Sequence, residues 1–117
     1  MAKQRVYAIV SQKGGVGKTT LTTNLAAAYQ RMGKTVLLVD SDPQGSLRDW
    51  HAAAGENNTH PPVVAMDRAV QFKDLAGLAA NYDIVLIDGA PSVQELAVAA
   101  IKASHMVLIP VQPSPYD

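Results

Sequence analysis

Cysteine is absent from this 117-residue sequence, which excludes disulfide frameworks, thiolate zinc sites, iron–sulfur ligation and cysteine nucleophiles. An excess of either charge is also absent, because 10 Lys and Arg residues balance 10 Asp and Glu residues. The chain as a whole therefore lacks the basic field with which proteins hold nucleic acid. No apolar run approaches the roughly 18 residues of a membrane span, and the first residues lack the apolar stretch of a secretory signal.

What the sequence does contain is a globular balance of residues. Apolar residues make up 48% and charged residues 17%, which excludes disordered and collagen-like chains. The length suits one domain spanning residues 1–117. These features predict a soluble, cytoplasmic domain.

Short apolar runs alternate with segments of helical periodicity. The expected strands cover residues 5–11, 35–40, 63–66, 83–88 and 105–111. The expected helices cover residues 18–32, 42–54, a segment ending near residue 80, and residues 93–102. This alternation predicts a three-layer α/β/α fold with a mostly parallel, twisted sheet. Ligands of such sheets bind at the carboxyl ends of the strands.

The strongest local signal is the segment QKGGVGKTT, which follows the first apolar run and precedes a helical pattern. Its glycines allow the main chain to come close to a ligand, and successive amides with a helix N-terminus form an anion site. The strict pattern would place glycine where the chain has Gln12. The residues expected to bind the phosphates are Lys13, Gly14, Gly15, Val16, Gly17, Lys18, Thr19 and Thr20.

Three residues at the end of this segment have individual expected roles. Lys18 would reach the β and γ phosphates, and Thr19 would offer its hydroxyl to Mg²⁺. Thr20 is placed for the α phosphate. The expected ligands are therefore ATP or ADP with Mg²⁺.

Three aspartates end two of the expected strands. Asp40 and Asp42 follow one apolar run and Asp88 ends another, which suits Mg²⁺ held through few carboxylates, water and phosphate oxygens. Asp42 stands before Pro43, so it is also expected as a helix N-cap. Asp40 is assigned to the metal region, with a purely structural role at the strand end as the alternative.

The segments KGGVGKTT, LLVDSDPQGSLRDW, YDIVLIDGAPS and MVLIPVQPSPYD together resemble the ParA/MinD class of ATPases with a deviant Walker A motif. Within that class they are most similar to the short, ParF-like partition ATPases. The resemblance implies a P-loop NTPase fold and hydrolysis of ATP. It also implies that the 117 residues are the N-terminal portion of a longer family domain, which lacks its C-terminal part here.

The resemblance assigns further roles to single residues. Lys13 would reach across a dimer to the partner's nucleotide, whereas charge alone would make it a solvated loop lysine. Asp42 would position the attacking water, and Asp88, like a Walker B aspartate, would hold Mg²⁺ through water. The family often has two prolines after this aspartate and one further residue, but here Gly89 precedes one alanine and Pro91. This departure concerns the loop rather than the aspartate.

The function that the resemblance implies is an ATP-driven dimerisation switch in plasmid or chromosome partition. Its implied partners are a second copy of the chain, a ParB-like centromere-binding protein and nonspecific DNA, with a nucleoid-associated location and no membrane. The alternatives are a MinD-like division-site ATPase and a truncated, non-catalytic nucleotide-binding protein.

Residues outside these motifs are expected to be structural. The sequence predicts Trp50 as a packing residue, and the three histidines have no metal-ligand spacing. The prolines at 110, 113 and 115 are expected to end a strand and make a turn, although the resemblance places them near the nucleotide.

Overall fold

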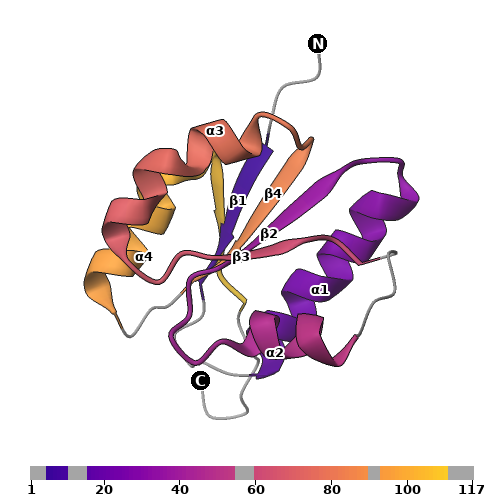
Figure 1. The fold of residues 1–117 in the computed structure, drawn as a ribbon, viewed down its shortest axis with the longest axis horizontal. Helices are drawn as coiled ribbons and strands as arrows, with labels where there is room; N and C mark the ends of the chain where they lie inside the picture. The colour runs from indigo at the N-terminus through magenta and orange to yellow at the C-terminus, as the bar shows by residue number, and fades with distance from the viewer. Residues whose placement is uncertain (1–4, 11–15, 55–59, 90–92, 111–117) are drawn as a thin grey trace.

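The computed structural model describes residues 5–10, 16–54, 60–89 and 93–110 of the chain. Its elements are β1 (Arg5–Ile9), α1 (Val16–Arg31), β2 (Val36–Asp40), α2 (Ser46–Ala53), β3 (Val63–Ala65), the 3₁₀ helix η1 (Ala69–Asp74), α3 (Leu75–Ala79), β4 (Ile84–Asp88), α4 (Gln94–Ala103) and β5 (Met106–Leu108). The strands form one sheet in the order β3-β2-β4-β1-β5, with every neighbouring pair parallel (Figure 1). The predicted α/β fold with a mostly parallel sheet is therefore confirmed.

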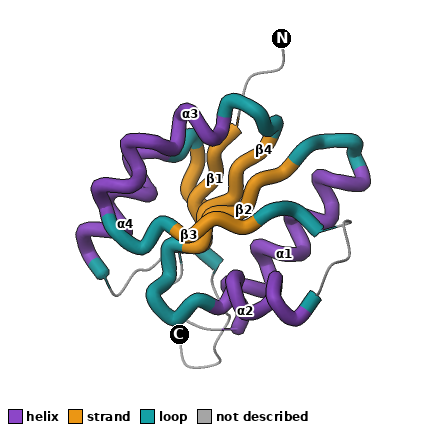
Figure 2. The backbone as a smooth tube through the Cα atoms, in the orientation of Figure 1, coloured by secondary structure: helices purple, strands orange, loops and turns teal. Residues whose placement is uncertain are grey.

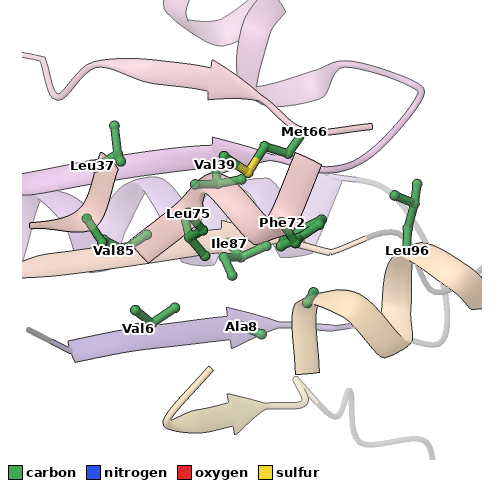
Figure 3. Packing of buried hydrophobic residues seen from close by; sticks show 12 residues of the cluster. Val6, Ala8, Leu37, Val39, Met66, Phe72, Leu75, Val85, Ile87 and Leu96 are labelled. Atoms are coloured by element: carbon green, nitrogen blue, oxygen red, sulfur yellow. The ribbon is translucent and has the colours of Figure 1, made fainter. Parts of the chain in front are cut away.

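Helices cover both faces of the sheet, because side chains of a strand alternate between its faces. One face packs against η1, α3 and α4, and the other packs against α1 and α2 (Figure 2). On the first face, Phe72 and Leu75 lie close to Val85 and Ile87 of the central strand (Figure 3). A buried side chain of this size contributes about 1.5–3 kcal/mol. This packing stabilises a helix as short as α3, which would be marginal in isolation.

The two strands that carry the aspartates are the most deeply placed. Every residue of β2 and β4 is buried, as their continuous apolar runs predict for strands covered on both faces. The strand ends differ slightly from expectation: β1 ends at Ile9 and β5 at Leu108. The buried strands thus provide a rigid base for the loops that follow them.

The start of α2 differs from the prediction. The helix begins at Ser46, and its N-cap is Gly45 in the left-handed region (φ 71°), so the assignment of Asp42 as the N-cap is wrong. Asp42 instead stabilises a turn, because its Oδ1 accepts the backbone N–H of Gln44 at 2.9 Å and its carbonyl accepts that of Gly45 at 2.9 Å. Aspartate side chains commonly hold such turns in place of a helix.

The helix that ends near residue 80 is also divided. Residues Ala69–Asp74 form η1, and only Leu75–Ala79 are α-helical. Phe72, Leu75 and Ala79 are buried as predicted, whereas Ala76 is exposed. Within the described residues, no helix has both the length and the apolar character needed to cross a bilayer.

A hydrogen-bonded pair joins the amino ends of β2 and β4, opposite the predicted ligand edge. The carboxyl of Asp83 accepts the backbone N–H of Thr35 at 2.9 Å and its hydroxyl at 3.2 Å. The backbone hydrogen bond is the main reason that the pKa of Asp83 is lowered from its ordinary value of 3.8. A lowered carboxyl pKa adds stability that is present above the unfolded value and is lost as pH falls through the folded one.

We therefore expect Asp83→Asn to flatten the acid side of the stability profile. Urea unfolding of the wild type and the variant between pH 2 and pH 7 measures this, and the gap between them should narrow below about pH 4. Thr35→Ala is the matched control, because it keeps the backbone N–H and should retain most of the acid dependence. A gap that stays constant down to pH 2 would contradict the expectation.

Candidate functional site

The carboxyl ends of β1, β2 and β4 meet at one edge of the sheet. Asp40 and Asp88 are direct partners in the β2–β4 register. The pairing continues one step past the strands, because the N–H of Ser41 donates to the carbonyl of Asp88 at 3.0 Å and that of Gly89 donates to Ile9 at 2.9 Å. Both bonds involve the single peptide group that joins Asp88 to Gly89. The predicted ligand edge is therefore the place where the aspartates gather.

Lys18 is buried at this edge, in the first turn of α1. Lys18 is only 2% exposed to solvent. Its Nζ lies 3.1 Å from Oδ2 of Asp42 and 3.0 Å from Oδ1 of Asp88. The same ammonium group donates to the carbonyl of Gly89. A buried ammonium needs such partners, because an isolated charge is costly to remove from water. The structure thus brings together three residues that the sequence predicted for the site.

Asp88 occupies the centre of this arrangement. Burial raises the pKa of its carboxyl, while the nearby Lys18 ammonium acts in the opposite direction. The Thr19 hydroxyl donates to its Oδ2 at 3.2 Å. Oδ1 has no hydrogen-bond partner in the described part of the chain apart from the ion pair with Lys18. The Asp88 carboxylate thus has one oxygen that can still accept a hydrogen bond and one that accepts the Thr19 hydroxyl. A carboxylate and a hydroxyl placed in this way suit a hydrated cation.

Much of the predicted phosphate loop lies outside the described residues. These include Lys13, Gly14 and Gly15, and α1 begins at Val16. The hydroxyl of the buried Thr22 donates to the carbonyl of Lys18 at 2.8 Å, so the first turn of the helix is held internally. Thr20 is exposed. The described part of the loop therefore places an ammonium and a hydroxyl beside the carboxylates.

Asp40 does not contact Lys18, and its two oxygens face the other way. Oδ1 accepts the backbone N–H of Asp42 at 3.1 Å. Oδ2 accepts the backbone N–H of Arg48 at 3.1 Å and its Nε at 3.0 Å. Asp40 is fully buried. These contacts support the structural alternative for Asp40.

Arg48 is the residue of this region that the sequence did not single out. It lies on α2, and its guanidinium contacts both Asp40 and the carbonyl of Asp42. An arginine eight positions beyond an aspartate has no local pattern that would reveal this contact. The signal is visible only once the turn between β2 and α2 is formed.

The remaining predictions concern residues beside the site. Trp50 packs partly buried against the core and meets the ring of His60 edge-on at 5.1 Å, which confirms it as a packing residue. His105 is exposed, and its Nδ1 accepts the N–H of Val6 at 2.9 Å. Pro110 follows β5, and the later prolines lie outside the described residues. Within the described ranges, no group of three or more His, Cys, Asp or Glu residues is arranged to hold a metal ion.

Comparison with known proteins gives a consistent picture. Residues 7–109 match the model of the CobQ/CobB/MinD/ParA nucleotide-binding domain. The chain is 36% identical to the chromosome-partitioning ATPase Soj of Thermus thermophilus, covering 98% of this chain and 57% of Soj. It is also 36% identical to the maintenance of carboxysome distribution protein A of Halothiobacillus neapolitanus, covering 100% of this chain and 56% of that protein. The chain thus spans little more than half the length of these relatives.

Solved structures show the same architecture. The cobyrinic acid a,c-diamide synthase of Mycobacterium smegmatis, solved with an ATP analogue and magnesium, superposes with a TM-score of 0.75 at 28% identity, covering 94% of this chain and 59% of that chain. The pNOB8 ParA bound to nonspecific DNA superposes with a TM-score of 0.70 at 26% identity, covering 97% of this chain and 55% of that chain. Both likenesses extend over nearly the whole described fold.

Proposed function

The chain belongs to the CobQ/CobB/MinD/ParA nucleotide-binding family, and from this premise we propose that it is a Mg²⁺-dependent ATPase that acts in DNA partition. The observation that carries the proposal is the buried ammonium of Lys18, held between Asp42 and Asp88 at the carboxyl edge of the sheet. A lysine in this position, at the start of a helix after a glycine-rich segment, is equipped to receive phosphate oxygens. The partition ATPase Soj among the relatives supports the cellular role.

The chain's own residues would bind the nucleotide as follows. The main chain and side chains of residues 13–20 would hold the phosphates. The Lys18 ammonium would release the Asp42 carboxylate and contact phosphate oxygens instead. Thr19 and Asp88 fit a hydrated magnesium ion, because a hydroxyl and a carboxylate oxygen lie together at the N-terminal end of α1. When bound, Mg²⁺ supplies charge neutralisation of the phosphates.

Asp42 is the proposed water-positioning residue. Its carboxylate lies at the same edge as Lys18 and is 12% exposed, so one side of it remains open to water. In a nucleotide-bound protein, loss of the Lys18 contact would leave Oδ2 free to accept a proton from the attacking water. Proton transfer to a positioned group of this kind contributes about 10²–10⁴-fold in rate.

The switch is proposed to operate between two copies of the chain. Lys13 of each copy would neutralise the phosphates bound to the other, as an arginine finger does, which contributes about 10³–10⁵-fold. Loss of the γ phosphate would remove these contacts and loosen the dimer. A ParB-like protein and nonspecific DNA are the proposed partners, and the pNOB8 ParA complex with nonspecific DNA supports the second. The proposed location is the cytoplasm, in association with the nucleoid.

A second candidate is the positioning of a cargo other than DNA. The carboxysome distribution protein of the comparison supports it, because the match covers 100% of this chain and 56% of that relative. The same ATP-driven switch would serve either cargo, so the two candidates differ in the adaptor protein and not in the chemistry.

Mixing two inactive variants tests the dimeric switch. Lys13→Ala and Asp42→Ala proteins should each have little turnover of Mg-ATP. In a symmetric dimer, an equal mixture should recover about a quarter of the wild-type rate, because half of the dimers are mixed and each has one complete site. Phosphate release and sedimentation with ATP or ADP are the measurements. No recovery in the mixture would show that Lys13 acts within its own subunit.

A further inference from the structure

Both main-chain groups of Asp42, its N–H and its carbonyl, are hydrogen-bonded to neighbouring residues. Its N–H donates to Oδ1 of Asp40 at 3.1 Å. Its carbonyl accepts two donors, the N–H of Gly45 at 2.9 Å and Nη2 of Arg48 at 2.9 Å. The orientation of the Asp42 carboxylate towards Lys18 therefore depends on three neighbours that form no hydrogen bond or ion pair with Lys18 in the described part of the chain.

Arg48 and Asp40 close this arrangement into a ring. Nε and the backbone N–H of Arg48 both donate to Oδ2 of Asp40, at 3.0 Å and 3.1 Å. The carboxyl of Asp40 is fully buried, where a charge-assisted bond is stronger than it is in water. One guanidinium thus binds the end of β2 through Asp40 and the turn after it through the Asp42 carbonyl.

Gly45 leaves space for the guanidinium. A Cβ at this position would lie 3.3 Å from both Nε and Nη2 of Arg48, and the left-handed backbone (φ 71°) itself favours glycine. A third contact of Arg48, Nη1 to Oδ2 of Asp67 at 3.7 Å, is half exposed and long. Surface pairs of that kind contribute little, so Asp67 provides a neighbouring residue with which the main contact can be compared.

We propose that Arg48 is a positioning residue for Asp42: it fixes the turn at residues 42–45 against the end of β2 and so aims the Asp42 carboxylate. The inference rests on the proposed function, in which Asp42 orients the attacking water. Displacing a reacting group by about 1 Å can cost on the order of 10²-fold in rate. Arg48 would then affect turnover without touching the nucleotide.

The test uses Arg48→Lys and Arg48→Met in the 117-residue chain. Lysine keeps a positive charge beside Asp40, but its single ammonium does not reproduce the planar fork that also reaches the Asp42 carbonyl. For Arg48→Lys we expect a thermal midpoint and a nucleotide affinity near wild type, with kcat reduced about 10–100-fold, as for other supporting residues. Arg48→Met should reduce kcat at least as much. Asp67→Asn and Arg31→Met are the controls and should keep the wild-type kcat.

A second readout needs no turnover. Hydrogen–deuterium exchange of the peptide covering residues 41–47, in the nucleotide-free protein, should be faster in Arg48→Lys than in wild type, while exchange of β1 and β4 is unchanged. Equal loss of nucleotide affinity and kcat, or unchanged exchange of 41–47 with wild-type kcat, would overturn the inference. In the double variant Asp42→Ala/Arg48→Lys, the arginine change should add no further loss.

The proposed role of Asp42 and the positioning role of Arg48 are tested by different variants. If Asp42→Ala alone hydrolyses ATP normally, the proposed role of Asp42 is wrong, and with it the inference. If Asp42→Ala is inactive but Arg48→Lys has the wild-type kcat and exchange, only the positioning role of Arg48 is wrong.

Discussion

Lys18→Ala is expected to abolish nucleotide binding and, in the same variant, to destabilise the nucleotide-free protein. Binding is lost because this ammonium, which lies between the Asp42 and Asp88 carboxylates in the nucleotide-free protein, is the cation proposed to contact the β and γ phosphates. Stability is lost because removal of one member of a buried ion pair leaves the other charge uncompensated, at a cost of about 3–5 kcal/mol. Urea unfolding and titration with a fluorescent ATP analogue measure the two effects separately.

A second substitution separates folding from binding. Burial raises the pKa of Asp88, which means that the folded protein disfavours its charged form. Asp88→Asn in the Lys18→Ala background should therefore restore much of the stability, but no nucleotide binding. Lys102→Ala, which removes an exposed lysine at the end of α4, is the control and should change neither quantity. Wild-type nucleotide affinity in Lys18→Ala would disprove the phosphate-binding role.

Asp42→Ala is expected to bind Mg-ATP and to dimerise, yet to turn over hardly at all. The carboxylate lies beside Lys18 and keeps one side accessible, so its loss should leave the phosphate contacts of residues 13–20 in place. The expected reduction in kcat is about 10²–10⁴-fold, the usual contribution of a positioned general base. Single-turnover measurement of phosphate release, together with sedimentation of the ATP-bound protein, would show both parts of the result.

Asp42→Asn refines this experiment. Its amide oxygen can still accept the N–H of Gln44, which Asp42 accepts at 2.9 Å, so the turn should persist while the charge is lost. The variant should be as inactive as Asp42→Ala but closer to wild type in stability. Asp49→Ala, an exposed position in the first turn of α2, should keep wild-type turnover. Normal hydrolysis by Asp42→Asn would assign water positioning to another residue.

Most of the fold is predictable from the sequence because its strands are continuous apolar runs. β2 and β4 are buried along their whole length, and no amphipathic alternative competes with that pattern. The start of α2 was mispredicted for a local reason. Asp before Pro43 is a common helix beginning, but here the carboxyl of Asp42 holds a turn and the helix starts only after the left-handed Gly45.

The site, like the fold, is predictable where it depends on the strands and not where it depends on a local turn. The meeting of Asp42 and Asp88 with Lys18 follows from topology, since parallel strands bring their carboxyl ends to one edge. The distribution of contacts among the aspartates does not, because it depends on where the chain turns after β2. Arg48 was missed because its partners are reached through that turn. Lys13 lies outside the described residues, and its role stays a prediction.

The peptide group between Asp88 and Gly89 couples neighbouring strands at the carboxyl edge of the sheet. The group between Asp88 and Gly89 bonds to Ser41 on one side and Ile9 on the other, and the next carbonyl accepts the Lys18 ammonium. Since a peptide group is rigid, it cannot tilt towards one neighbour without moving away from the other. A Cβ at Gly89 would lie only 3.0 Å from the Ile9 carbonyl oxygen. The main chain of Gly89 is therefore packed closely against the end of β1. The carboxyl ends of β1 and β2 are in this way coupled through the end of β4, so a displacement of one is transmitted to the other.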